Sequence, residues 1–124
     1  RQNERVIVKE KTNARFLTDQ IIKDPLDAIV CDASFISLKK VLPSGLSLLK
    51  TKGWLAALIK PQFEVGKGLV GKGGVVRDPE LHQEVVADIK NWLQHDMNMY
   101  LSGVVESPIL GPSGNKEFVI VANK

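Results

Sequence analysis

The sequence contains few of the residues that form covalent, metal-bound or membrane-spanning structures. Its 124 residues include a single cysteine, Cys31, which excludes a disulfide within the chain and a multi-cysteine zinc site. The two histidines, His82 and His95, lie far apart with no third ligand in view, so no metal site is expected. No apolar run approaches the roughly 18 residues that span a membrane, and residues 1–5 do not resemble a signal peptide. These features are typical of a protein of the reducing cytoplasm.

The composition indicates one small globular domain whose charge is unevenly distributed. Hydrophobic residues make up 44% of the chain and charged residues 25%, which are ordinary values for a soluble domain. The net charge is only +3, but residues 60–77 contain Lys60, Lys67, Lys72 and Arg77 against a single acid, Glu64. A basic loop favours an anionic partner such as nucleic acid, although a solvated lysine-rich loop has the same composition.

Hydrophobic periodicity and turn residues divide the chain into alternating strands and helices. Strands are predicted at 5–9, 27–31, 54–59, 99–106 and 117–121, helices at 35–50 and 79–96, and a short helix or irregular segment at 16–23. Pro43 is expected to divide the 35–50 segment into two helical pieces. The pattern predicts an α/β fold with a largely parallel sheet and helices on both faces. The last two strands are joined by a short turn-rich link, so they are expected to run antiparallel.

The helix at 79–96 has the clearest signals. Asp78 is a favourable N-cap, Pro79 suits the first helical position, and Glu80 suits the positive end of the helix. Apolar residues then follow the helical period at Leu81, Val85, Ile89, Trp92 and Leu93. The periodicity predicts that one face of this helix packs in the core.

The glycine-rich loop that follows strand 54–59 contains two matches to nucleotide-binding sequence motifs. We reject both as evidence of a nucleotide site. Residues 66–71 fit G-x-G-x-x-G, but that motif needs its first glycine directly after a strand and its last one opening a helix. Residues 66–72 fit G-x-x-x-x-G-K, but Gly73 replaces the Ser or Thr hydroxyl that binds magnesium. The backbone N–H groups of such a loop can still bind phosphate.

Three ionisable residues, Asp32, Lys60 and Glu117, stand at predicted strand ends. Asp32 and Lys60 follow parallel strands, and Glu117 opens a strand of opposite direction, so all three belong to the carboxyl edge of the sheet. Neighbouring strands lie about 4.8 Å apart, so these side chains can meet if their strands are adjacent. The alternative is three unrelated surface charges at loop entries.

Several segments together resemble one family. They are D-A-S-F-I-S-L at 32–38, K-P-Q-F-E at 60–64, G-K-G-G-V-V-R-D-P at 71–79, G-P-S-G-N-K-E-F at 111–118 and K-T-N-A-R at 11–15. These segments resemble the TlyA family, bacterial FtsJ-like 2′-O-ribose RNA methyltransferases that are often labelled hemolysins. The resemblance implies a Rossmann-like, S-adenosylmethionine-dependent methyltransferase fold. It also implies that residues 1–124 are the C-terminal portion of that domain, without its first strands, its cofactor loop and an N-terminal S4-type domain.

The resemblance also implies roles for individual residues. Asp32, Lys60 and Glu117 match the last three members of the family's Lys-Asp-Lys-Glu tetrad, whose first lysine has no counterpart here. Asn13 and Asp32 are expected to contact S-adenosylmethionine, although a turn asparagine without that role fits Asn13 nearly as well. We expect Lys67, Lys72 and Arg77 to contact RNA phosphates in ribosomal RNA or ribosomal subunits, with strong salt dependence.

The chemistry leaves two roles open for the lysine. A lysine can act as the base on the ribose hydroxyl only if its pKa falls from about 10.4 toward neutrality. Otherwise it stays charged and stabilises the developing alkoxide.

Two functions other than methylation are also open for the chain. They are a non-catalytic RNA-binding module and, following the family label, membrane lysis. In the implied strand order the strand at 28–31 has an unpaired edge and residues 5–9 have no neighbour, which favours either self-association of this chain or a poorly held N-terminal segment.

Overall fold

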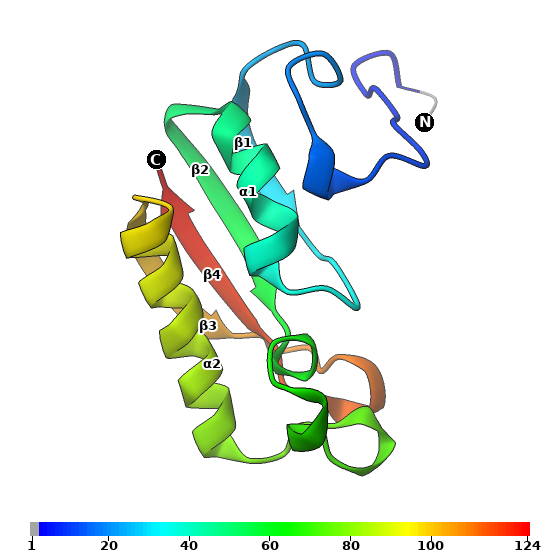
Figure 1. The fold of residues 1–124 in the computed structure, drawn as a ribbon, viewed down its shortest axis with the longest axis vertical. Coiled ribbons are helices and arrows are strands. Elements are labelled where there is room, and N and C mark those ends of the chain that lie inside the picture. The colour runs from blue at the N-terminus through cyan, green and yellow to red at the C-terminus, as the bar shows by residue number, and fades with distance from the viewer. Residues whose placement is uncertain (1–2) are drawn as a thin grey trace.

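The computed structural model describes residues 3–124 and shows a four-stranded sheet with two α-helices and several short helical turns (Figure 1). Arg1 and Gln2, which begin the stretch without signal-peptide character, lie outside the described residues. The strands are β1 (Leu26–Cys31), β2 (Leu49–Ile59), β3 (Tyr100–Glu106) and β4 (Phe118–Asn123). The α-helices are α1 (Leu38–Leu48) and α2 (Pro79–Asn91).

The sheet has the order β1-β2-β4-β3. β1 pairs with β2 in parallel, whereas β4 is antiparallel to both β2 and β3, so three of the four strands run the same way. The predicted α/β fold and the antiparallel final hairpin are therefore confirmed. β1 lies at an edge of the sheet, as the implied strand order predicts.

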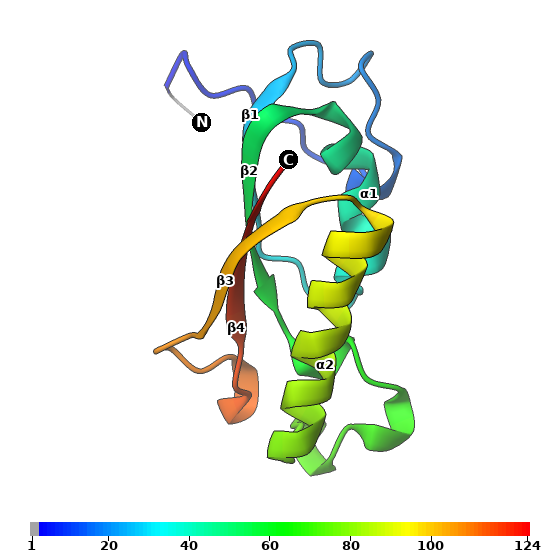
Figure 2. The ribbon, with the colours of Figure 1, turned by 90° about the vertical axis from the view of Figure 1, so that its left-hand side faces the viewer.

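Both α-helices cover the same face of the sheet, as the view along its edge shows (Figure 2). The expectation of helices on both faces is therefore wrong for the part of the chain that the structure describes. On the opposite face, apolar side chains of the strands are exposed. They are Val30, Trp54, Tyr100 and Val105, with exposed fractions between 47% and 74%.

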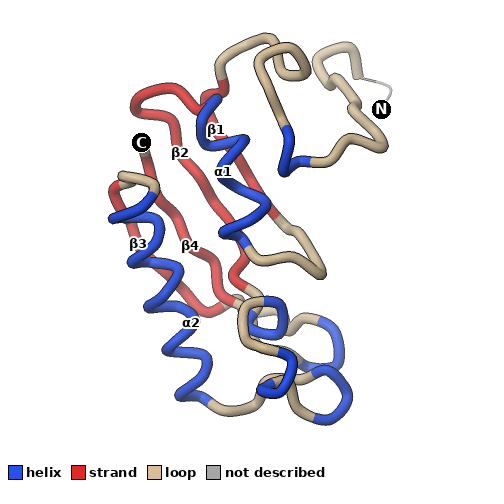
Figure 3. Tube along the Cα trace, in the orientation of Figure 1, coloured by secondary structure: helices blue, strands red, loops and turns tan. Residues whose placement is uncertain are grey.

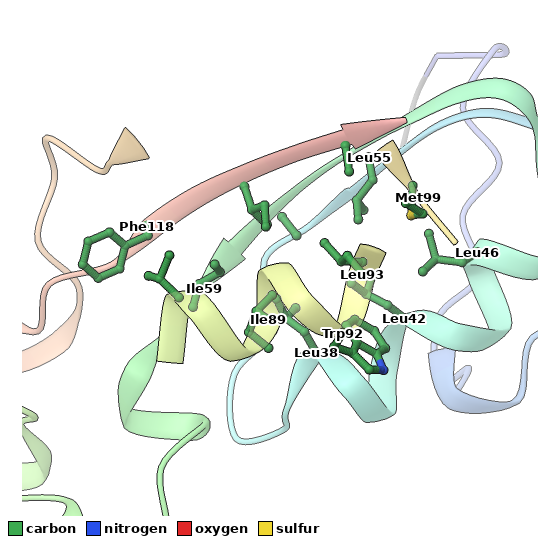
Figure 4. Packing of buried hydrophobic residues seen from close by; sticks show 14 of the residues in the cluster. Leu38, Leu42, Leu46, Leu55, Ile59, Ile89, Trp92, Leu93, Met99 and Phe118 are labelled. Carbon is green, nitrogen blue, oxygen red and sulfur yellow. The ribbon is translucent and has the colours of Figure 1, made fainter. Parts of the chain in front are cut away.

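The core fills the space between the sheet and the helices (Figure 4). Leu55, Ile59 and Ile120 point into it from the sheet and are 0% exposed. Alternation along β2 and β4 explains this arrangement, because every second residue of a strand points to the same face. Leu38, Leu42, Leu46, Ile89 and Leu93 supply the helical side.

Helix α2 begins where the sequence predicts. The Asp78 side chain accepts a hydrogen bond from Glu80 N at 2.9 Å, and Pro79 is the first helical residue. A wider π-helical turn, Trp92–Asp96, continues α2 and completes the predicted 79–96 segment. The apolar stripe from Val85 to Leu93 is buried in the core, which confirms the periodicity, whereas Leu81 in the first turn is half-buried.

Three local predictions are wrong. Residues 49 and 50, expected at the end of the 35–50 helix, already belong to β2, which begins five residues before the predicted strand at 54–59. Residues 5–9 form no strand and are exposed, because no neighbouring strand is present among the described residues to receive their backbone hydrogen bonds (Figure 3). Pro43 does not break α1, which runs continuously through it. The tertiary contacts of Leu42 and Leu46, both 3% exposed, outweigh the lost backbone hydrogen bond.

Candidate active site at the carboxyl edge of the sheet

The register of the strands places Lys60 and Glu117 on one edge of the sheet. Ile59, the last residue of β2, pairs with Phe118, the first residue of β4. Lys60 and Glu117 are the next residues outward on these two strands. Asp32 directly follows Cys31, the end of β1, on the same edge. The sheet geometry expected from the sequence is therefore present.

Lys60 is buried and its ammonium group is held in place. The residue is 8% exposed, and its Nζ lies 2.5 Å from Asp32 Oδ1 and 3.2 Å from Ser34 Oγ. An ammonium that donates to a carboxylate at this distance forms a charge-assisted hydrogen bond, which is stronger than a neutral one. The Asp32 side chain is 69% exposed, so the pair stands at the boundary between core and solvent.

Glu117 is buried beside this pair but is held by a different residue. It is 7% exposed, and its Oε2 accepts a hydrogen bond from Gln62 Nε2 at 3.1 Å. Within residues 3–124 no hydrogen bond or ion pair joins Lys60 to Glu117. The structure thus brings Lys60 and Asp32 into direct contact and links Glu117 to the segment after β2 through Gln62.

Glu64 joins the segment after β2 to the start of α1. Its carboxylate accepts hydrogen bonds from Ser37 Oγ at 2.6 Å and from Leu38 N at 2.9 Å. Burial raises the pKa of Glu64, although these two hydrogen bonds act in the opposite direction. Ser37 also caps α1 by accepting from Lys39 N. Glu64 therefore fixes the loop that carries Asp32 relative to the segment that carries Lys60.

Asn115 fastens the glycine-rich loop to the segment before β4. It is 2% exposed; its Oδ1 accepts from Val76 N at 3.0 Å, and its Nδ2 donates to Gly74 O and Pro112 O at 2.9 and 3.0 Å. His82 is 4% exposed and contacts Val76 O through its Nε2 at 2.7 Å. His82 is therefore a packing residue at the start of α2.

The basic residues of the loop point to solvent. Lys67, Lys72 and Arg77 are exposed, and none of them belongs to an ion pair among the described residues. Arg77 Nη1 donates to the Lys72 carbonyl at 3.3 Å, which draws two of the three positions together. The loop lies at the same end of the sheet as Lys60 (Figure 1).

Asn13 lies outside this cluster. Its exposed side chain accepts a hydrogen bond from Arg15 N at 3.0 Å and caps a short helical turn, Ala14–Phe16. No hydrogen bond joins it to Asp32, Lys60 or Glu117 in the described part of the chain. Its expected contact with the cofactor stays a prediction.

Cys31 precedes Asp32 and is half-buried. Burial raises the pKa of its thiol, so this side chain stays neutral and is a weak nucleophile at pH 7. Among residues 3–124 no three His, Cys, Asp or Glu side chains are grouped as metal ligands would be. No helix in the same range has the length and apolar character to cross a bilayer.

Sequence patterns alone do not single out Gln62, Glu64 and Asn115. Their hydrogen-bond partners lie 26 to 55 residues away, except for the contacts of Asn115 with its own turn. The available signal is their position inside the segments 60–64 and 111–118, which carry the family resemblance. Polar residues in loops are ordinarily exposed, so the burial of these three residues can be recognised only from the folded structure.

The mixed sheet, with antiparallel β4 inserted between β2 and β3, is consistent with a Rossmann-like methyltransferase fold. An S-adenosylmethionine-dependent methyltransferase structure from Methanosarcina mazei superposes with a TM-score of 0.54 at 18% identity, over 91% of this chain and 65% of that chain, which shows the fold alone. The model of the FtsJ-like methyltransferase family matches residues 1–124. The chain therefore belongs to the FtsJ-like methyltransferase family.

Two relatives are more similar to this chain in sequence than that structure is. The 16S/23S rRNA (cytidine-2′-O)-methyltransferase TlyA of Mycobacterium tuberculosis is 45% identical over 120 residues, which make up 97% of this chain and 44% of that protein. A Lactococcus lactis crystal structure provisionally named a hemolysin superposes with a TM-score of 0.92 at 36% identity, over 99% of this chain and 59% of that chain. The chain spans about half the length of these relatives. The TlyA-type resemblance read from the motifs is confirmed.

Proposed function

We propose that the whole protein that contains this chain transfers a methyl group from S-adenosylmethionine to a ribose 2′-hydroxyl of ribosomal RNA. The observation that carries this proposal is the buried Lys60, paired at 2.5 Å with Asp32 on the carboxyl edge of the sheet. Open α/β sheets bind their ligands at this edge. The name of the TlyA relative, 45% identical to this chain, supports the same reaction and substrate.

Of the two roles open to Lys60, we infer that of charged stabiliser. Its Nζ already contacts the Asp32 carboxylate and the Ser34 hydroxyl, an arrangement that orients an ammonium group. An ammonium fixed beside the ribose oxygen stabilises the negative charge that develops there, without reorganisation during the reaction. Asp32 orients Lys60, and Glu117 contributes a second negative charge at the same edge.

Asp32 is also the residue of this chain that best fits the methyl donor. Its exposed carboxylate at the end of β1 can accept hydrogen bonds from ammonium or hydroxyl groups of S-adenosylmethionine. Asn13, whose side chain is exposed, would contact the adenine edge. When bound, the donor supplies a methyl group on a positively charged sulfur.

The exposed basic loop supports RNA as the substrate. Lys67, Lys72 and Arg77 would contact phosphates and position the RNA without reading its sequence. Because such contacts release counterions, we expect binding of ribosomal subunits to weaken steeply as salt increases. The cytoplasm, where ribosomes are found, is the compartment that this proposal implies.

Methyl transfer from labelled S-adenosylmethionine to each ribosomal subunit tests the proposal in the whole protein. Lys60→Ala is expected to lower the rate by at least about 100-fold, because one preorganised donor to a developing oxyanion contributes this much. Lys50→Ala is the matched control, since Lys50 is an exposed lysine that pairs with Asp27 at the start of β1. A folded Lys60→Ala protein with full activity would contradict the assignment of Lys60.

The competing functions account for less of the structure. A non-catalytic RNA-binding module uses the exposed loop but gives no reason to bury a lysine against a carboxylate. In membrane lysis, α2 would have to present its apolar stripe to lipid. That stripe is in the core, where Val85, Ile89 and Leu93 are at most 7% exposed. A dye-release assay on vesicles checks this directly, and we expect no release.

For this chain by itself, we propose self-association through the open edge of β1. β1 ends the sheet, and Val30 on it is 74% exposed. An unpaired, apolar edge strand offers backbone groups to a strand of another chain.

A further inference from the structure

His82 is a buried histidine that the proposed reaction does not use. It lies near the start of α2 and is 4% exposed, and its ring meets the ring of Phe118 edge-on, with centroids 5.9 Å apart. Its Nε2 lies 2.7 Å from the carbonyl oxygen of Val76. Because a carbonyl oxygen can only accept, Nε2 carries the proton and donates it to this hydrogen bond. His82 thus joins α2 and the start of β4 to the loop that precedes the helix.

The backbone of Val76 is held on both sides. Its N–H donates to Asn115 Oδ1 at 3.0 Å, and its carbonyl oxygen accepts from His82. Asn115 is 2% exposed and lies before β4, so two buried side chains from different parts of the chain hold one loop residue. The side chain of Val76 is itself buried. Val76 is therefore the point at which the loop is anchored to the rest of the fold.

Residues 71–77 form a basic turn around this anchor. Val75 and Val76 are buried at its base, whereas Lys72 and Arg77 are exposed. Arg77 Nη1 donates to the Lys72 carbonyl at 3.3 Å, which keeps the two basic residues close together. The three glycines of this turn give an unanchored backbone many conformations, and the anchor restricts them. A turn that is fixed before binding loses less conformational entropy when it binds.

We propose that His82 is a positioning residue for RNA, which holds the Val76 carbonyl so that Lys72 and Arg77 meet RNA phosphates in one fixed arrangement. This inference rests on the proposed function, in which these two basic residues contact RNA. Arg77 directly follows Val76, so loss of the anchor displaces Arg77 and breaks its contact with Lys72. Both side chains must then be ordered anew when RNA binds, which lowers the affinity.

The test measures binding of the whole protein to isolated ribosomal subunits at several salt concentrations, together with methyl transfer to them. His82→Phe keeps a ring beside Phe118 and removes the donor, and His82→Leu is a second variant without a donor. We expect Kd for the subunits to rise at least about 5-fold, the effect of ordering two long side chains on binding. The salt dependence should weaken toward that of a variant that combines Lys72→Ala and Arg77→Ala. Because binding alone is affected, KM should rise while kcat stays unchanged.

Further variants separate positioning from stability. His82→Gln again places a side-chain N–H near the Val76 carbonyl, so most of the lost affinity should return. Where Lys72→Ala and Arg77→Ala are already present, His82→Phe should weaken binding no further, because the residues through which His82 acts are gone. His95→Phe, at an exposed position in the helical turn that continues α2, is the matched control and should bind like the wild type.

Each outcome decides the question. Unchanged binding in a folded variant without the donor overturns the inference, and so does a failure of His82→Gln to recover affinity. An equal loss with and without the two basic residues assigns His82 to stability alone and also overturns it. A wild-type protein that shows the expected coupling but transfers no methyl group supports the inference and overturns the proposed reaction. A wild-type protein that binds neither subunit overturns both.

Discussion

At the scale of single residues, the close approach of Gly111 to Glu117 leaves no room for a side chain. A Cβ at position 111 would lie 2.2 Å from Glu117 Oε2. The backbone of Gly111 has φ −79°, which any residue can adopt, so the restriction is purely steric. Glycine is needed here because the chain passes directly beside the buried carboxylate.

We expect Gly111→Ala to displace Glu117 from Gln62. The overlap should lower the free energy of unfolding by about 1–3 kcal/mol, the usual cost of adding a methyl group to a tightly packed site. In the whole protein, methyl transfer should fall as well. Urea unfolding measures the first effect and labelled methyl transfer the second. Gly66→Ala is the control, because a Cβ there meets nothing within 4 Å; equal behaviour of the two variants would contradict the steric argument.

Glu64 predicts a pH dependence of stability. Burial raises its pKa above the ordinary value of 4.5, so the folded state binds the proton more tightly than the unfolded state. The resulting stabilisation is complete below the unfolded pKa and is lost as pH rises through the folded one. The difference in free energy of unfolding between the wild-type chain and Glu64→Gln should therefore favour the wild type most at low pH. Urea titrations between about pH 4 and pH 7 check this, and a difference that does not vary with pH would refute it.

The residues at the site differ in how far the sequence could predict them. Lys60, Asp32 and Glu117 are predictable because they stand at strand ends on one edge of the sheet and match the tetrad of the family that the motifs resemble. Gln62 and Asn115 are not, because their roles depend on partners in other loops. Only the folded chain shows that their amides are buried.

At the scale of secondary-structure elements, local signals succeed where they agree with packing. The Asp78–Pro79 start of α2 is predicted correctly because the cap is a local interaction. The strand expected at 5–9 fails because a strand exists only with a neighbour. The helix α1 shows the opposite conflict, in which packing keeps Pro43 within a continuous helix.

Pro43→Ala should stabilise this chain. Proline cannot donate a hydrogen bond to the carbonyl of Lys39 one turn earlier, and alanine restores that bond. We expect the free energy of unfolding to rise by about 1–3 kcal/mol, as thermal or urea unfolding would show. Lys40→Ala, at an exposed position of the same helix, should change it by less than about 0.5 kcal/mol. A loss of stability in Pro43→Ala would mean that the packing of the proline ring contributes more than the missing backbone hydrogen bond costs.

At the scale of the whole molecule, the two faces of the sheet are unequal. One face is covered by α1 and α2 (Figure 2). The other exposes apolar side chains beside the open edge of β1. The sequence predicts strands and helices but does not fix the face on which each helix lies, since both helices need only one apolar stripe. The uncovered face is therefore a result of the structure.

This chain alone is expected to self-associate. Light scattering after size-exclusion chromatography should give a mass that exceeds the monomer and rises with concentration. Val30→Lys places a charge on the exposed edge strand and should shift the chain toward monomer. Val6→Lys, at a position that is 52% exposed outside the sheet, is the control. A monomer at every concentration would contradict the proposed role of the β1 edge.

The position of β4 has a consequence for the timing of synthesis. Residues 118–123 form an inner strand that separates β2 from β3, although they are made after both. Until these residues leave the ribosomal exit tunnel, β2 and β3 have no common neighbour and Glu117 has no fixed position. A nascent chain therefore contains Lys60 and Asp32 before the carboxyl edge of the sheet is complete. The site is assembled only after translation has passed β4.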